Sequence, residues 1–136
     1  MAAPKDTRSD VGLLLLRLMF GGMMLTHGVP KLLGFADKMD SFPDLLGMGS
    51  TVSLTLAVFA EVGCATLVAL GAFTRLAVVP LVITMAVAAF IVHGDDPLGR
   101  KELALVYLGA YLAIGLLGAG RFSIDAKLPA RFAKLK

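Results

Sequence analysis

The sequence predicts an all-α membrane protein, a four-transmembrane-helix bundle with a short interfacial helix in its first outer loop. Hydrophobic residues make up 57% of the 136 residues, and the mean hydropathy is +0.83. Four apolar runs are each long enough to cross the hydrocarbon core of a bilayer, which needs about 20 helical residues. The predicted spans are 11–29, 52–73, 75–93 and 103–119. They form one membrane domain, 11–120, between a cytoplasmic tail, 1–10, and a basic cytoplasmic tail, 121–136.

The first two spans each carry one charged residue at depth. Arg17 is the only charge in the first span before His27, and Glu61 lies near the middle of the second. An ionised group at the bilayer centre costs several kcal/mol unless a partner compensates it. The helical rise of 1.5 Å per residue puts the two residues at similar depth, so the sequence predicts a buried Arg17–Glu61 pair. Such a pair serves either chemistry or the register of the helices.

The segments that follow complete the bundle. In the first loop, 30–50, apolar and acidic residues alternate at near-helical spacing, which predicts a short amphipathic helix broken near Pro43. The tight turn at 73–75 makes the second and third spans antiparallel neighbours. Thr84 in the third span, and Tyr107 and Tyr111 in the fourth, are predicted to add polar groups to the bundle interior.

Polar residues also gather at the predicted outer mouth of the bundle. They are His27, Lys31, His93, Asp95, Asp96 and Glu102. A hydrogen-bonded cap, a route for protons or substrate, and a metal site are all compatible with these residue types. No two of them have the His-x-x-x-His or Glu-x-x-His spacing of a strong metal motif, so no metal is predicted.

Charge and cysteine content limit the function further. Outside the spans, eight Lys and Arg residues fall on the side of the termini and four on the other, which predicts cytoplasmic termini. The net charge of +3 therefore reflects topology and gives no reason to expect nucleic-acid binding. The lone Cys64 cannot form a thiol redox pair, and no haem, flavin or iron-sulfur motif is present. Glycines in the spans are expected to let helices approach closely.

Several motifs follow one another in the order seen in a known family. They are Arg17; His27-Gly28-x-x-Lys31-Leu32-x-Gly34-Phe35; Glu61-x-Gly63; Gly71-x-x-Thr74-Arg75; Met85-Ala86; and Gly118-x-Gly120-Arg121-Phe122-Ser123-Ile124-Asp125. In this order they resemble the DoxX family of small four-helix membrane proteins. The chain has Gly118-Ala119-Gly120 where the family usually reads Gly-Pro-Gly.

The resemblance implies a membrane subunit of a quinone-linked redox system in a bacterial or archaeal cytoplasmic membrane. The family is similar to the DoxD subunit of a thiosulfate:quinone oxidoreductase, and one relative is associated with an oxidoreductase complex that involves superoxide dismutase and a sulfurtransferase. The matching residues are Arg17, His27, Lys31, Glu61, Arg75 and Asp125.

In the expected site, Glu61, Arg17 and His27 are catalytic, and Tyr111, Tyr107, Lys31 and Thr84 contact a quinone or other substrate. Any activity would then be that of an oxidoreductase subunit whose electrons come from a partner redox protein. Two alternatives remain open at this point. One is a non-enzymatic membrane adaptor or scaffold for a partner complex. The other is a small transporter or channel subunit, which with so few spans requires a homo-oligomer.

Overall fold

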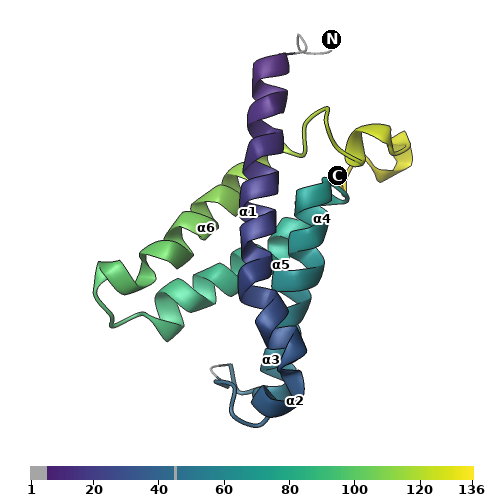
Figure 1. The fold of residues 1–136 in the computed structure, drawn as a ribbon. Coiled ribbons are helices and arrows are strands. Elements are labelled where there is room, and N and C mark those ends of the chain that lie inside the picture. Colours follow the sequence, from purple (N-terminus) through teal and green to yellow (C-terminus); the bar gives the residue numbers. More distant parts are fainter. Residues whose placement is uncertain (1–5, 45) are drawn as a thin grey trace.

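The described part of the chain, residues 6–44 and 46–136 of a computed structural model, is helical and contains no strand, which confirms the predicted all-α class. Figure 1 shows α1 upright beside the α3–α4 segment, with α5 behind them and α6 on the other side. The helices are α1 (Thr7–Leu33), α2 (Phe35–Lys38), α3 (Ser50–Val58), η1 (Phe59–Cys64), α4 (Ala65–Leu70), α5 (Thr74–Val87), η2 (Ala88–Val92), α6 (Leu98–Leu117), η3 (Asp125–Lys127) and η4 (Ala130–Phe132).

Three helical segments are long and apolar enough to cross a membrane, counting only the residues that the structure describes. These are α1, the continuous segment Ser50–Leu70 and the continuous segment Thr74–Val92. The continuous segments contain the short π-helical stretches η1 and η2. The fourth predicted span corresponds to α6, which begins with the charged residues Arg100, Lys101 and Glu102 and is not among the three. Its crossing of the membrane therefore stays a prediction.

Close helix packing holds α1 against the second segment. A Cβ atom added to Gly28 would lie 2.7 Å from the Glu61 carbonyl carbon, and one added to Gly21 would lie 2.8 Å from the Ala65 carbonyl oxygen. Both distances are shorter than side chains tolerate, so only glycine allows this approach, as expected from the glycine content of the spans. α5 packs mainly against α6. It also contacts η1 and α4, and the chain turns between α4 and α5 in three residues, 71–73, which confirms that the second and third predicted spans are neighbours.

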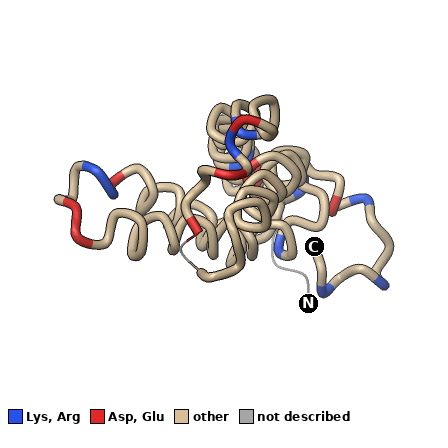
Figure 2. Tube along the Cα trace, turned by 90° about the horizontal axis from the view of Figure 1, so that it is seen from below, with Lys and Arg blue, Asp and Glu red and all other residues tan. Residues whose placement is uncertain are grey.

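The two ends of the bundle differ. One end, called the open end below, is formed by residues 34–44, 46–49 and 93–97; the other, the clamped end, is formed by residues 71–73 and 118–136. In Figure 1 the lower part of α5, η2 and the start of α6 lean away from α1, so that the turn between η2 and α6 lies to the left of the first loop. In Figure 2 most charged positions lie in turns and end segments, while the helices between them are largely uncharged.

The first loop holds less helix than the sequence suggests. α1 continues through Pro30 to Leu33, and the only helix in the described part of the loop is the single turn α2. Turns and bends follow from Met39, before Pro43. The predicted amphipathic helix is thus reduced to four residues. α1 takes the first part of the loop into its own last turn, and turns already begin at Met39, ahead of Pro43.

Candidate functional site

An ion pair between Glu61 and Lys31 lies near the open end. The Lys31 Nζ atom is 2.7 Å from Glu61 Oε2 and also donates a hydrogen bond to the His27 carbonyl, 3.1 Å away. Glu61 lies on η1 and is only 6% exposed, whereas Lys31 in the last turn of α1 is partly exposed. The carboxylate is therefore inside the protein and its partner reaches in from the rim, an arrangement that the long lysine stem allows.

Local backbone geometry sets the position of this pair. η1 is a π-helical stretch, and such stretches are rare and frequent at functional sites. It brings the Glu61 backbone against Gly28, one turn before Lys31 on α1. The absence of a side chain at Gly28 is what allows the ammonium group and the carboxylate to meet.

The predicted Arg17–Glu61 pair is wrong. Glu61 is level with Gly28, and Arg17 lies eleven residues earlier on α1, which corresponds to about 16 Å along the helix axis. The prediction assumed that the apolar runs 11–29 and 52–73 begin and end at the same membrane depths. In the structure α1 is longer than its apolar run at both ends, so it is shifted relative to the second segment.

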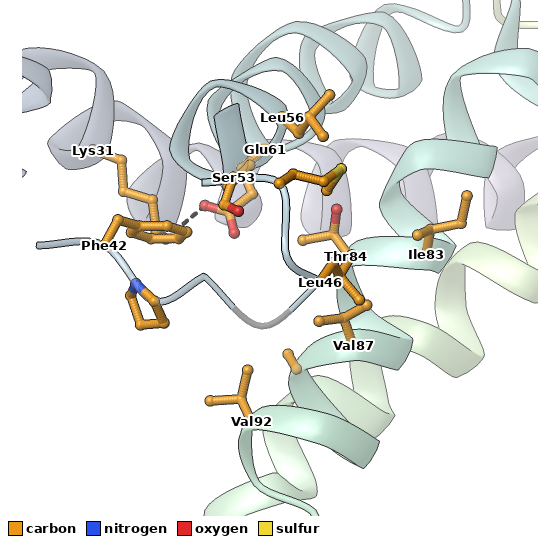
Figure 3. A pocket seen from close by; sticks show the side chains of 14 residues that line it. Lys31, Phe42, Leu46, Ser53, Leu56, Glu61, Ile83, Thr84, Val87 and Val92 are labelled. Atoms are coloured by element: carbon orange, nitrogen blue, oxygen red, sulfur yellow. Dashed lines mark hydrogen bonds and ion pairs between the residues drawn. The ribbon is translucent and has the colours of Figure 1, made fainter. Parts of the chain in front are cut away.

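An apolar cavity of about 340 Å³ opens on one side of the ion pair. Figure 3 shows the Lys31–Glu61 pair at one edge of this cavity, opposite Thr84 and its apolar neighbours. The Thr84 hydroxyl donates to the Pro80 carbonyl at 2.8 Å. The other lining residues are mainly apolar and come from the first loop, α3, α5 and η2: Phe42, Pro43, Leu46, Met48, Ser53, Leu56, Ala57, Ile83, Val87, Ala88 and Val92.

A more polar cavity of about 300 Å³ lies on the other side of the same pair. Lys31, Glu61 and Ala88 line both cavities. The remaining lining residues come from α1, α5, the loop at 93 and α6: Met24, His27, Met85, His93, Arg100, Leu103, Ala104 and Tyr107. The His27 and Tyr107 rings meet edge to face with centroids 5.8 Å apart. The ion pair thus separates an apolar space from a space rich in cationic and titratable groups.

Only part of the predicted outer cluster reaches this cavity. The Nδ1 atom of His93 is 2.7 Å from Asp96 Oδ2, and this hydrogen bond, with nearby cations, lowers the pKa of the half-buried Asp96. Because the ionised carboxylate only accepts, Nδ1 donates and Nε2 of a neutral His93 is left as an acceptor. Asp95 and Glu102 are exposed and line neither cavity. Within the described residues, no three His, Cys, Asp or Glu side chains gather as a metal site.

Arg17 belongs to a separate cluster at the clamped end. Its side chain is 1% exposed and donates to the carbonyls of Ala119, at 2.9 Å, and Phe122, at 2.7 Å. The buried Asp125 accepts hydrogen bonds from the backbone N–H groups of Phe73, at 2.6 Å, and Thr74, at 2.9 Å, at the start of α5. Arg17 and Asp125 thereby hold the 118–125 segment against α1 and against the turn between α4 and α5.

Gly71 makes room for this cluster. Its φ is +70°, which favours glycine, and an added Cβ would collide with the Arg17 guanidinium. Arg17 therefore contacts the 118–125 segment and lies against Gly71, and it lines neither cavity.

The model of the DoxX family matches residues 12–94, more than half of the chain. The chain belongs to the DoxX family. With its three long apolar helices, this DoxX protein is an integral membrane protein in contact with lipid. Searches of curated proteins and of solved structures each gave no match.

The motif residues of this DoxX chain fall into two groups. His27, Lys31 and Glu61 surround the cavities at the open end, whereas Arg17 and Asp125 hold the clamped end. The exposed Arg75 also lies at the clamped end and donates to the Leu116 carbonyl at 3.3 Å. One group of motif residues thus surrounds the two cavities, and the other is packed against backbone at the clamped end.

The other predicted site residues are divided in the same way. Tyr107, Thr84 and His93 line a cavity. Tyr111 does not, because it is completely buried and its hydroxyl donates to the Phe20 carbonyl at 2.9 Å. The predicted site did not include Arg100, which lines the polar cavity. Its spacing of three and four residues from Leu103 and Ala104 places all three on one face of α6, and this was the available signal.

Proposed function

We propose that this DoxX protein is the quinone-binding membrane subunit of a redox system, with the Lys31–Glu61 pair as the site that meets the quinone head. One observation carries the proposal: an ion pair whose carboxylate is buried stands at the edge of an apolar cavity in a membrane protein. A charged residue within a membrane helix marks a functional site by default. Apolar pockets with a few polar groups at one end are typical of ligand sites.

The size and lining of the apolar cavity suit such a ligand. Its volume of about 340 Å³ is at the lower end of the range for small-molecule sites, which is roughly 300–1,000 Å³. This space is sufficient for a ring head, while an isoprenoid tail would extend into lipid. Lys31 has three N–H donors, and two are engaged by His27 and Glu61. The remaining donor is available to a carbonyl oxygen of the ligand.

Quinone reduction requires electrons and protons, and residues of this chain can supply the protons. Glu61 would hold a proton at its carboxyl group and pass it to the ligand oxygen, with Lys31 keeping that oxygen in place. The electrons would come from a partner redox protein, as in a thiosulfate:quinone oxidoreductase or a related sulfur or oxidative-stress system. In this proposal Glu61 and Lys31 contact the quinone, His27 and Tyr107 support the pair, and Thr84 lines the ring site.

The proposal includes a topology. α6 is the fourth transmembrane helix, both termini are cytoplasmic, and the open end faces the other side of a bacterial or archaeal cytoplasmic membrane. The twelve Lys and Arg residues outside the apolar cores support this orientation, since eight of them would be cytoplasmic.

Quinone binding by the purified protein tests the function. The protein in lipid discs would be titrated with a short-tailed ubiquinone analogue, and bound ligand measured by mass spectrometry. We expect Glu61→Gln and Lys31→Gln each to weaken binding at least about tenfold, the effect of losing about 1.4 kcal/mol of interaction. Glu102→Gln, which removes an exposed carboxylate at the same end, is the matched control and should bind as the parent protein does.

Three outcomes would contradict the proposal. Binding that Glu61→Gln leaves unchanged removes the ion pair from the site. A stoichiometric partner protein, with no quinone in the parent complex, favours the adaptor function. A ring-shaped homo-oligomer that conducts solutes favours transport.

A further inference from the structure

We infer that the polar cavity is a one-sided aqueous route through which Glu61 exchanges protons with the face of the membrane at the open end. The inference deepens the proposed function, since it assigns the source of the protons that a bound quinone would take up. The water route itself is a property of the bundle, so it can be tested without quinone.

The route begins at Glu61 and ends at the loop 93–97. Glu61 and His27 line the same cavity, and His93 lines it where η2 ends. The charged and titratable groups around this space are Lys31 and His27 from α1, Glu61 from η1, His93 from the loop, and Arg100 and Tyr107 from α6. The apolar cavity on the opposite side of Glu61 contributes no other titratable group than Lys31.

Two histidines give this space the chemistry for proton transfer. Histidine exchanges protons near neutral pH because its ordinary pKa is about 6.5. His27 is exposed on α1 one helical turn from Lys31. His93 is oriented by Asp96, which leaves its Nε2 atom as the acceptor. Both rings line the same cavity as the ion pair.

The route is closed in the direction of the clamped end. Met24 and Met85 line the inner side of the polar cavity and are both buried. Beyond them the core contains Leu81, Tyr111 and Ile114, each completely buried. Arg17 and the 118–125 segment then close that end. A proton that leaves or reaches Glu61 must therefore pass by the open end.

Cysteine labelling tests the route. In a Cys64→Ala background, Ala104→Cys places a thiol in the polar cavity and Ala77→Cys, the control, places one in the packed core. A charged, membrane-impermeant methanethiosulfonate reagent would be added to right-side-out and inside-out vesicles. We expect Ala104→Cys to react in one orientation only, the same one in which Asp95→Cys reacts, and Ala77→Cys to react in neither. Failure of Ala104→Cys to react, or its reaction from the opposite face, would overturn the inference.

Proton exchange is then measured directly. After a pH step on the open-end side, infrared spectroscopy would follow the carboxyl band that disappears in Glu61→Gln. We expect the band to respond quickly in the parent protein and at least about tenfold more slowly when His27→Gln and His93→Gln are combined. An equal response to a pH step on the other side alone would refute the one-sided route. Unchanged kinetics in the double variant would refute the role of the histidines. Neither result depends on whether quinone binds.

Discussion

The charged side chains of Glu61, Arg17 and Lys31 have different surroundings. Glu61 has one charged partner and two cavities beside it. Arg17 has backbone carbonyl partners and lines neither cavity. Lys31 reaches from the rim to Glu61 with its flexible stem. The sequence correctly indicated Arg17 and Glu61 as special, because charge within an apolar run is visible. It could not reveal their partners, which depend on how far α1 slides along its neighbour.

Replacement of Arg17 by methionine should release the 118–125 segment. The substitution removes the two hydrogen bonds that the buried guanidinium donates to the Ala119 and Phe122 carbonyls. A hydrogen bond that involves a charged group contributes roughly 1.5–3 kcal/mol. Hydrogen exchange should become faster at the backbone N–H groups of Phe73, Thr74 and Asp125, which bridge the turn and this segment. Arg75→Met, at an exposed arginine of the same end, should leave exchange unchanged. If the amide hydrogens of Arg17→Met were as protected from exchange as those of the parent protein, Arg17 would not be what holds this segment.

At the scale of elements, the main determinant is the close approach of α1 to the second segment. Gly21 and Gly28 lie seven residues apart, two turns along one face of α1, and both face the backbone or small side chains of that segment. The glycine content of the spans predicted this kind of contact. The π-helical stretches η1 and η2 could not be predicted from the sequence. α-helices and π-helical stretches have the same amino-acid composition, and local packing decides which of the two forms.

Substitution of Gly28 by alanine should separate α1 from η1. The added Cβ would overlap the Glu61 backbone, and overpacking of this kind typically costs about 1–3 kcal/mol. Thermal unfolding in detergent should shift to lower temperature, and quinone binding should weaken because Lys31 moves away from Glu61. Gly22→Ala is the control, since an added Cβ there meets no atom within 4 Å. Its unfolding temperature should stay the same or rise, because alanine favours a helix. Equal stability of both variants would argue against glycine-dependent packing.

At the scale of the whole molecule, the bundle has a tightly packed end and an end with two cavities. The all-α class and the order of the helices followed from apolar runs and turn residues. It was harder to predict whether the fourth span crosses the membrane, because three of the first five residues of α6 are charged. Charged residues at a helix start occur both in transmembrane helices and in helices that lie at the surface. The open end was predicted only as a cluster of polar residues. The tilt of α5 and α6 decides which residues of that cluster line a cavity and which face solvent. This tilt results from tertiary packing, so the sequence does not reveal it.

The proposed four-span topology predicts which residues share a membrane face. In a Cys64→Ala background, Ser9→Cys and Lys134→Cys should react with an impermeant maleimide only from the cytoplasmic side. Asp95→Cys should react only from the opposite side, because three crossings separate it from the first tail and one from the last. Labelling of right-side-out and inside-out vesicles distinguishes these cases. Reaction of Lys134→Cys and Asp95→Cys from one and the same face would show that α6 does not cross.

The partners of Arg17 have a consequence for biosynthesis. They lie 102 and 105 residues later in the chain. At a synthesis rate of about 5–20 residues per second, the first helix waits on the order of 5–20 s in the membrane before the carbonyls that receive its guanidinium exist. During this interval the guanidinium of the nascent chain lacks the partners that it has in the folded protein. The clamped end can therefore form only after almost the whole chain has been synthesised, and a chain that stops before Ala119 cannot satisfy the Arg17 guanidinium in this way.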